Sequence, residues 1–393
     1  MVQFSRFSGK LSFTLMLTMS LMVAGVGPLG FSKAAAQDNA SQADVSADNA
    51  NYVIETVAEG LVLPWGIAFL PKGDMLVTEL DGRLRLISNG ALVNDAVANV
   101  PEVYRASQGG LMDVVIHPDY ESNQLVYLSL AVGTPESNAL RVIRARFTGD
   151  SLENVQTVFE AAPRKNTPVH YGGRMTFLAD KTLLITVGDG FDYREEAQNP
   201  SNHFGSIVRV TDDGKVPADN PFVDSDTAQP EIWSIGHRNQ QSITYDALRD
   251  VVFETEHGAQ GGDELNLIEP AKNYGWPAIS WGLDYSGGRI SPFTEYEGLE
   301  QPLTYWVPSI GPSGMTVYRG QAFPEWDGDI LVSSLIFKHV VRIEMDGLKA
   351  VSQEILFAEI GERVRDVRTA PDGSIYVLVE GENGRVLKVS PRN

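Results

Sequence analysis

Short apolar runs separated by Gly, Asp and Pro turns recur along the chain from about residue 60 to the C-terminus. One unit begins with an apolar strand at Trp65, turns at Pro71-Lys72-Gly73, and continues with apolar strands from Met75 and Leu84. The same order returns near residues 111, 173, 241, 314 and 364. Repeats of this size, built from short strands without a convincing amphipathic helix, are typical of a β-propeller. The six units predict an all-β, six-bladed β-propeller.

The early strand Tyr52–Val57 precedes the first repeat. We expect it to join the last blade and close the ring, because closure removes two exposed strand edges. No linker-like composition interrupts residues 60–390, so residues 51–393 are predicted to form one domain. A β protein of two domains is the alternative.

The N-terminal residues have the composition of a targeting segment. Arg6 and Lys10 precede a mostly apolar stretch over residues 11–31, and Ala34-Ala35-Ala36 offers a small-residue cleavage site. We predict a signal peptide over residues 1–36, a disordered spacer over 37–50, and export to the periplasm. A retained membrane anchor is the alternative, but Gly and Pro interrupt the apolar stretch, so no membrane insertion is expected after processing.

Composition narrows the chemistry further. The chain has no Cys, which excludes disulfides, thiolate metal sites, cysteine catalysis and a lipid-modified cysteine. Its formal net charge of −20 argues against nucleic acid or anionic lipid as a partner.

The third unit places a histidine and an aspartate at the two ends of a predicted β-hairpin. Residues 175–178 and 183–187 are apolar runs, and a short Ala-Asp-Lys turn separates them. Both strands lead to the same edge, so His170 and Asp189 are expected to meet there. A neutral imidazole can act as a base, and a carboxylate could orient it. The alternative is a surface histidine and a turn aspartate.

Long insertions follow the third and fourth units, at residues 189–205, 211–231 and 256–310. Loops between propeller strands open onto the ends of the central channel, so these insertions indicate the functional face. The motif Gly236-His-Arg-Asn-Gln-Gln241 opens the fourth unit. Arg238 can donate to an anionic oxygen, and Asn239 and Gln241 can both donate and accept. A solvated turn is the alternative.

Two further motifs suggest a cation and an anionic ligand. The Gly-rich stretch 258–262 can turn carbonyl groups inward, and Asp263 and Glu264 add hard oxygen, a set that suits Ca²⁺ better than zinc. A purely structural turn is the alternative. Arg363 and Arg365 lie two apart at a strand start and are expected to project to one side, where they suit a ligand with several carboxylates. Pairing with acidic neighbours is the alternative.

Together these motifs resemble the soluble quinoprotein glucose and aldose sugar dehydrogenases, six-bladed propellers that use pyrroloquinoline quinone (PQQ) and Ca²⁺. The resemblance covers nearly the whole chain from Leu63 onward. It rests on Gln108-Gly-Gly-Leu-Met, His170-x-Gly-Gly-Arg, Gly188-Asp189, Gly236-His-Arg-Asn-x-Gln241, Gly261-Gly-Asp-Glu-Leu-Asn, Asn273-Tyr-Gly-Trp-Pro and Arg363-x-Arg-Asp.

The resemblance implies a dehydrogenase that oxidises aldose sugars at C1 to lactones. His170 would be the general base, Asp189 would hold its imidazole, and Arg238 would stabilise charge beside the quinone. The implied cofactor contacts are Gln108, Arg238, Asn239, Gln241, Tyr285, Arg363 and Arg365.

The resemblance also implies calcium ligands and partners. The backbone carbonyls of Gly258 and Ala259 match the catalytic Ca²⁺ ligands, and Glu264 and Tyr274 fit a second, structural Ca²⁺ site in some members. The expected partners are an aldose and an external electron acceptor, and the expected assembly is a monomer or homodimer.

One position departs from the family pattern. The family commonly has a cofactor-contacting Lys directly after Ser-Leu of the fifth blade, whereas here Ser334-Leu335 is followed by Ile336. Strand alternation would put Lys338 on the same side as Ile336, so Lys338 is a candidate substitute, displaced by about two residues. A calcium-dependent propeller hydrolase, such as a lactonase, and a non-catalytic binding propeller are the rival functions.

Overall fold

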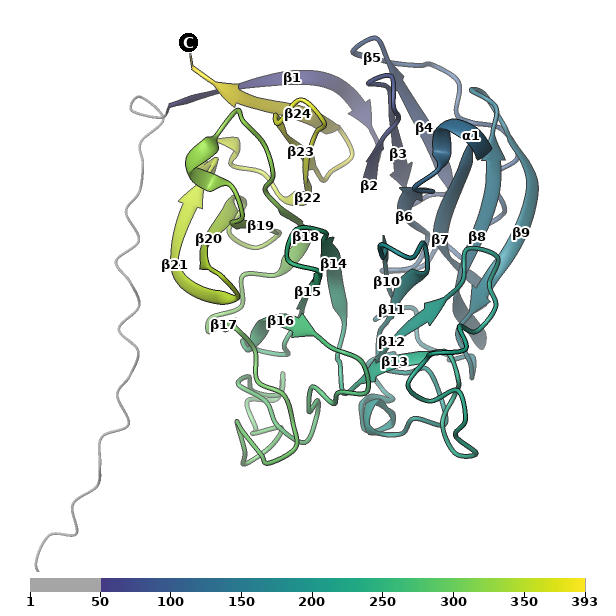
Figure 1. Ribbon diagram of the computed structural model, residues 1–393, viewed down its shortest axis with the longest axis vertical. Coiled ribbons are helices and arrows are strands. Elements are labelled where there is room, and N and C mark those ends of the chain that lie inside the picture. The colour runs from purple at the N-terminus through teal and green to yellow at the C-terminus, as the bar shows by residue number, and fades with distance from the viewer. Residues whose placement is uncertain (1–50, 393) are drawn as a thin grey trace, which may run out of the picture. The chain divides into compact units, whose positions relative to one another are not determined.

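Six antiparallel sheets of four strands each are arranged in a ring about a central axis in the computed structural model, which describes residues 51–392 (Figure 1). This arrangement confirms the predicted six-bladed β-propeller. The predictions of a signal peptide over 1–36 and a spacer over 37–50 lie outside the described residues.

The blades follow the chain in order. Blade 1 consists of β2 (Pro64–Phe69), β3 (Met75–Glu79), β4 (Arg83–Ser88) and β5 (Ala91–Leu92). Blade 2 consists of β6 (Leu111–Ile116), β7 (Leu125–Thr134), β8 (Ser137–Phe147) and β9 (Leu152–Glu160). Blade 3 consists of β10 (Gly172–Phe177), β11 (Leu183–Val187), β12 (Ser206–Val210) and β13 (Ile232–Ile235).

The other three blades repeat this order. Blade 4 consists of β14 (Gln240–Asp246), β15 (Val251–Glu256), β16 (Asp263–Ile268) and β17 (Thr304–Trp306). Blade 5 consists of β18 (Pro312–Val317), β19 (Ile330–Ser334), β20 (Val340–Asp346) and β21 (Lys349–Leu356). Blade 6 consists of β22 (Val364–Thr369), β23 (Ile375–Val379), β24 (Gly384–Pro391) and β1 (Tyr52–Leu61).

The N-terminal strand closes the ring, as the sequence predicted. β1 pairs antiparallel with β24, with Tyr52 opposite Pro391 and Leu61 opposite Gly384. The first and last described strands therefore lie in one sheet (Figure 1). This pairing joins the first and last described strands by main-chain hydrogen bonds and covers two strand edges at once.

Helical segments are short. They are α1 (Tyr120–Asn123) and the 3₁₀ turns η2 (Arg194–Gln198), η3 (Pro324–Trp326) and η4 (Ala358–Ile360). Among the described residues, none of the helices has the length and apolar character needed to cross a bilayer.

The apolar runs form strands because blades pack face to face and bury both faces of their middle strands. All five residues of β11 and all five of β19 are buried. The core is accordingly divided among the blades, with one cluster of buried side chains reaching from blade 2 into blade 3 and another from blade 5 into blade 6. Continuous burial on both faces explains why these strands read as unbroken apolar runs.

A buried arginine ties four blades together across the channel. Nη1 of Arg174 on β10 lies 3.3 Å from Asp113 Oδ1 on β6 and 3.0 Å from Asp366 Oδ2 on β22, and its Nε donates to the Gln241 carbonyl on β14. Its guanidinium also stacks on the ring of Trp65, 4.0 Å from the centroid. A charge buried this deeply is tolerated because both carboxylates and the carbonyl replace its water.

The long insertions lie where the sequence placed them, with one correction. Residues 189–205 and 211–231 connect β11 to β12 and β12 to β13. The third insertion, 256–310, is not one loop, because it contains β16 and β17. These strands complete blade 4, and the connection between them, residues 269–303, is the true insertion.

Candidate active site

The N-terminal ends of the innermost strands converge on two neighbouring cavities of about 300 Å³ each. One is bordered by His170, Asp189, Arg238, Ala259 and Tyr285, and we call it the base cavity. The other is bordered by Gln108, Asn239, Gln241, Arg363 and Arg365, and we call it the arginine cavity. Residues predicted from five separate motifs are therefore brought together at one end of the channel.

The predicted histidine–aspartate pair forms. His170 Nδ1 lies 2.7 Å from Asp189 Oδ1, and both side chains are almost fully buried. Asp189 Oδ1 also accepts from the Phe191 backbone N–H at 2.8 Å, and Oδ2 accepts from Trp276 Nε1 at 2.9 Å. Because Asp189 accepts from Nδ1, the tautomer is fixed and Nε2 is left as the basic nitrogen.

Electrostatics keep this pair as a neutral base beside an ionised acid. Burial lowers the pKa of His170 below 6.5, although the hydrogen bond to Asp189 acts in the opposite direction. For Asp189, burial raises the pKa, but the hydrogen bond and charge of His170 outweigh it and hold the pKa below 3.8. A histidine that is neutral near pH 7 can accept a proton, and the aspartate then stabilises the imidazolium.

The backbone at His170 is held in an unusual conformation. Its φ is +50°, a left-handed value that non-glycine residues rarely adopt. The Gln108 side-chain oxygen accepts its N–H at 2.8 Å, and the Lys165 ammonium donates to the carbonyls of Thr167 and Val169 just before it. Burial lowers the pKa of Lys165 to about 7. Strain of this kind persists only where surrounding contacts fix it, as they do here.

Arg238 shares the base cavity with His170 and contacts the backbone carbonyls of the loop that follows β15. Its guanidinium stacks 5.2 Å from the Trp276 ring, and Nη2 is 3.5 Å from the Tyr285 hydroxyl. Its Nη1 donates to the carbonyls of His257 and Gly258. The positively charged guanidinium group thus occupies the side of these carbonyls that a metal ion would otherwise contact. Of the two predicted Ca²⁺ ligands, Gly258 is one of these acceptors, and Ala259 borders the base cavity. Backbone carbonyl oxygens of this kind are hard ligands that suit Ca²⁺.

The two C-terminal arginines point to the same side, as expected. Arg365 Nη2 lies 2.7 Å from Glu380 Oε2, and Arg363 Nε lies 3.5 Å from the same oxygen. The alternative given for these two arginines, pairing with an acidic neighbour, is therefore also present in the structure. Asn239 and Gln241 lie across the arginine cavity, where the Gln241 amide donates to Asn239 Oδ1 at 3.3 Å. Amide and guanidinium groups at one cavity fit a polar, anionic ligand such as PQQ.

Glu264 and Tyr274 both border a small cavity behind the loop 256–262. The Tyr274 hydroxyl donates to the Leu267 carbonyl at 2.6 Å and accepts from the Glu269 N–H at 2.9 Å. Burial raises the pKa of Tyr274. For Glu264, burial and the neighbouring Glu256 raise the pKa well above 4.5. The tyrosine hydroxyl is thus engaged by the backbone of its own blade.

The expectation for Lys338 rests on a strand that is not there. β19 ends at Ser334 and β20 begins at Val340, so residues 335–339 form a turn in which Lys338 has a φ of +61°. Alternation therefore does not place Lys338 beside Ile336. Leu335 borders the arginine cavity, whereas Ile336 and Lys338 are exposed and do not border it.

A family model described as Glucose / Sorbosone dehydrogenase matches residues 61–388. The chain belongs to this family. The match spans the ring of blades and contains the residues that border both cavities.

Individual members of the glucose/sorbosone dehydrogenase family are similar over most of their length. Aldose sugar dehydrogenase YliI of Escherichia coli is 38% identical over 347 residues, covering 86% of this chain and 93% of the relative. The apo-form structure of soluble aldose sugar dehydrogenase from Escherichia coli gives a TM-score of 0.84 at 36% identity, covering 87% and 100% of the two chains. The PQQ-bound aldose sugar dehydrogenase from Streptomyces coelicolor gives 0.70 at 27% identity, covering 87% and 98%. The predicted family and oxidoreductase class are confirmed.

Sequence reasoning missed three side chains that support the site. Trp276 donates to Asp189 from 87 residues away, Lys165 braces the backbone before His170, and Glu380 lies between the two arginines. Trp276 was visible within the motif Asn273-Tyr-Gly-Trp-Pro, but no spacing in the sequence linked it to Asp189. Only the fold of the 269–303 connection brings them together.

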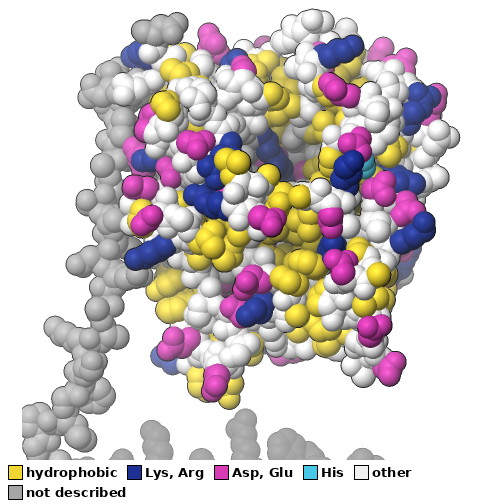
Figure 2. All heavy atoms as spheres, in the orientation of Figure 1, with side chains coloured by type: hydrophobic (Ala, Val, Ile, Leu, Met, Phe, Trp, Pro, Cys, Tyr) yellow, Lys and Arg dark blue, Asp and Glu magenta, His cyan; other side chains and the backbone are white. Residues whose placement is uncertain are grey.

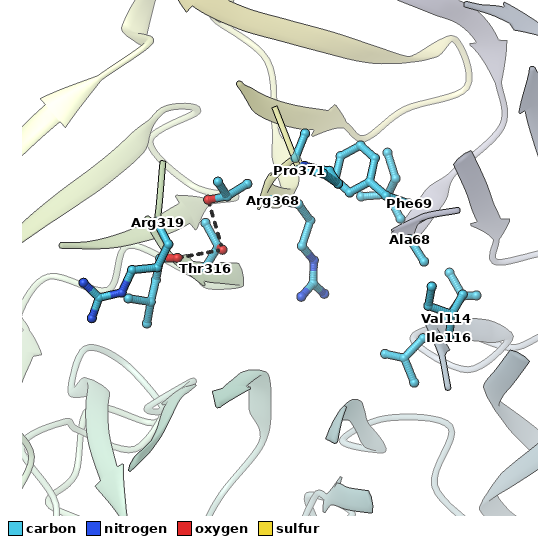
Figure 3. Close-up of a pocket in the computed structure, with 13 residues that line it drawn as sticks. Ala68, Phe69, Val114, Ile116, Thr316, Arg319, Arg368 and Pro371 are labelled. Carbon is cyan, nitrogen blue, oxygen red and sulfur yellow. Dashed lines mark hydrogen bonds between the residues drawn. The ribbon is translucent and has the colours of Figure 1, made fainter. Parts of the chain in front are cut away.

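Another cavity lies at the opposite end of the innermost strands. It measures about 530 Å³ and is bordered mainly by aliphatic residues, among them Ala68, Val114 and Ile116 (Figure 3). Arg368 points into it, and its Nε lies 3.2 Å from the Asp366 carboxylate (Figure 3). Asp113 on β6 and Asp366 on β22 both pair with Arg174. On each of these strands, residues before the aspartate border the arginine cavity and residues after it border the cavity at the opposite end.

A space-filling view shows the ring hollowed at its centre, with Lys and Arg side chains within the hollow (Figure 2). The net charge of the chain is nevertheless −20. The central arginines are paired with buried or partly buried carboxylates, Arg174 and Arg368 with Asp366 and Arg365 with Glu380.

Proposed function

We propose that this chain is a PQQ- and calcium-dependent dehydrogenase that oxidises aldose sugars at C1 to lactones. The observation that carries the proposal is the buried His170–Asp189 pair, whose fixed tautomer borders the same cavity as Arg238. The relatives named as aldose sugar dehydrogenases and the PQQ-bound homologue support the substrate class and the cofactor.

The chain's own residues would perform the proton chemistry. His170 Nε2 would remove the proton of the C1 hydroxyl, and Asp189 would remain ionised and stabilise the imidazolium that forms. Phe191 and Tyr285 stack beside the base with ring centroids 6.2 Å apart and would help to exclude water. Arg238 would supply a fixed positive charge where negative charge develops.

The residues present fit both absent groups. Arg363 and Arg365 would hold carboxylates of PQQ, and the amides of Gln108, Asn239 and Gln241 would bind its polar edge. When bound, PQQ supplies a quinone that accepts hydride from the sugar. The carbonyls of Gly258 and Ala259 would hold Ca²⁺, a Lewis acid, once Arg238 yields its contact with Gly258.

Export and assembly complete the proposal. The N-terminal sequence supports a periplasmic location after removal of residues 1–36. Electrons would leave to an external acceptor, and the protein would act as a monomer or homodimer. Glu264 and Tyr274 are proposed as a second, structural Ca²⁺ site.

Reconstitution tests the proposal directly. The purified apoprotein is titrated with PQQ and Ca²⁺, and dye reduction is followed across a panel of aldoses and of lactones. We expect a bound-quinone spectrum and turnover that depends on an aldose. Lactone hydrolysis without PQQ would instead favour the hydrolase.

His170→Gln separates catalysis from binding. The variant should lose about a hundredfold to ten-thousandfold in kcat, because general-base catalysis contributes that much. PQQ affinity, measured by fluorescence titration, should stay near that of the wild type. A retained rate would remove the assigned role from His170.

A further inference from the structure

Blade 4 contains a group of buried carboxylates that the proposed reaction does not use. Glu254 and Glu256 on β15 pair across the sheet with Asn266 and Glu264 on β16. Residues two apart on a strand project to the same face, so all four side chains share one face of the blade. The Asn266 amide nitrogen lies 3.2–3.3 Å from an oxygen of each of the three glutamates. Like charges placed opposite one another in a sheet are destabilising.

A histidine completes this arrangement. His237, directly before Arg238, is fully buried, and its Nδ1 lies 3.2 Å from Glu256 Oε1. Its Nε2 lies 2.9 Å from the Ser234 hydroxyl. One ligand atom each from His237, Glu254 and Glu256 lies within 4.8 Å of the others, close enough to share one ion. We call His237, Glu254, Glu256 and Asn266 the blade 4 cluster.

Two oxygens of the cluster are buried without any partner. Glu254 is 0% exposed, and its Oε1 accepts no hydrogen bond. One oxygen of the same carboxyl group is among the three atoms that are close enough to share an ion. Asn266 is 1% exposed and its Oδ1 is also unpartnered. Gln240, opposite Glu256 on β14, has an unpartnered Oε1 as well. Burying an oxygen without a hydrogen-bond partner destabilises the folded state, and a bound cation would offset that cost.

No basic side chain neutralises the cluster. Within residues 51–392, the ion pairs of Glu254, Glu256 and Glu264 include no Arg or Lys, only His237 with Glu256. The buried Glu79 of blade 1 shows the contrast, because Arg83 and Arg85 both pair with it. A cavity of about 10 Å³ bordered by Glu256 and Glu264 adjoins the cluster. A space of that size holds one water-sized particle.

We infer that the blade 4 cluster binds a divalent cation through Glu254, Glu256 and His237, with the Asn266 amide turned so that its carbonyl oxygen faces the ion. The mixed nitrogen and oxygen ligands suit Mn²⁺ or Zn²⁺ better than Ca²⁺. The site is separate from the backbone carbonyls of Gly258 and Ala259 and needs neither PQQ nor sugar.

The ion would also brace the candidate active site. Glu256 accepts the Arg238 backbone N–H through its second oxygen. A ligated Glu256 would therefore fix the start of β14 and the base of the Arg238 side chain, as partners of metal ligands commonly do.

The test uses metal-stripped full-length protein without PQQ. Equilibrium dialysis against MnCl₂, ZnCl₂ and CaCl₂ measures ions bound per chain, and thermal unfolding measures the midpoint with and without each ion. We expect one equivalent of Mn²⁺ or Zn²⁺, and a midpoint higher by about 5 °C at a hundredfold excess over Kd.

Glu254→Gln is the decisive variant, because it keeps the shape of the side chain. It should lose that one equivalent and the rise in midpoint, while its own metal-free midpoint equals or exceeds that of the wild type. Glu344→Gln, an exposed position on β20, is the matched control and should bind as the wild type does.

Three outcomes would overturn the inference. They are no Mn²⁺ or Zn²⁺ bound in the wild type, unchanged Mn²⁺ or Zn²⁺ binding in Glu254→Gln, and loss of a Ca²⁺ equivalent alone in Glu254→Gln, which would refute the ion class. If Glu254→Gln does not fold, His237→Gln is measured in the same way and must lose the same equivalent. Because PQQ and sugar are absent, failure here is independent of the proposed dehydrogenase activity.

Discussion

The His170–Asp189 pair and the blade 4 cluster both place a histidine beside buried carboxylates, but the oxygens of those carboxylates have different partners. Asp189 accepts three hydrogen bonds, from His170, Phe191 and Trp276. In the cluster, one Glu254 oxygen has no partner, and a single Asn266 amide serves both glutamates of the cluster and the neighbouring Glu264. A buried carboxylate whose oxygens all accept hydrogen bonds needs no further partner. A buried oxygen without a hydrogen bond indicates that a partner is missing.

The largest expected effect comes from breaking the satisfied pair. Asp189→Asn removes the acceptor that fixes the His170 tautomer and the charge that stabilises its protonated form. We expect kcat of the reconstituted enzyme to fall by about a thousandfold, within the range that a positioned acid–base group contributes. Steady-state dye reduction measures it. Asp192→Asn, exposed at the border of the same cavity, is the control and should stay within a few-fold of the wild type.

The pH profile sharpens the same comparison. The His170 pKa lies below 6.5 because of burial, so the base is neutral at pH 7 and becomes protonated only in more acidic solution. Asp189, Arg238 and Lys165 are the charged groups that face it. We expect kcat/KM to be flat at neutral pH and to fall about tenfold per unit below the apparent pKa. An apparent pKa above 6.5 for this acidic limb would contradict the assignment.

The free energy of unfolding should also fall as the solution becomes more acidic. The folded His170 pKa is lower than the unfolded value, so the unfolded chain binds more protons between the two values. The contribution of His170 to stability is therefore present above about pH 6.5 and is lost as the pH falls through that window. Urea unfolding at several pH values measures this trend, and His170→Gln should reduce it.

One type of substitution should have opposite effects on stability in the two regions. Burial and repulsion by Glu256 raise the pKa of Glu254 well above 4.5, and its Oε1 has no partner. Glu254→Gln replaces this carboxyl group by an amide that is neutral at every pH and can donate to Glu256, so it should raise the free energy of unfolding of metal-free protein by about 1–2 kcal/mol. Asp189→Asn removes a satisfied acceptor and should lower it by about 1–3 kcal/mol. Urea unfolding in the presence of a chelator checks both. Equal losses in the two variants would remove the distinction between the two regions.

The sequence was sufficient for the fold and for the meeting of His170 with Asp189, because repetition and hairpin geometry are local properties. The six repeats, the closure by β1 and the meeting of His170 with Asp189 all follow from strand alternation and hairpin geometry. The function of each side chain stays a proposal, since spacing brings residues together without showing what they bind.

What the sequence could not provide are contacts between distant segments. The Trp276 bond to Asp189 and the position of Glu380 between Arg363 and Arg365 depend on how long connections pack over the channel. The Lys338 expectation was wrong because a turn replaces the strand on which the alternation argument depended. The blade 4 cluster was hidden for a similar reason, since Glu254 and Asn266 meet only through the β15–β16 register.

The smallest expected effect concerns the most remote partner of the satisfied pair. Trp276→Phe keeps the ring beside Arg238 but removes the N–H that Asp189 Oδ2 accepts at 2.9 Å. Asp189 keeps its bonds to His170 and Phe191, so the loss should be that of one hydrogen bond to a charged group, about 1.5 kcal/mol or tenfold in kcat/KM. The acidic limb of the pH profile should shift slightly upward, because Asp189 with fewer donors is a stronger acceptor for the His170 proton. A structural role alone would lower the unfolding midpoint without moving this limb, so the two readouts together decide whether Trp276 acts through Asp189.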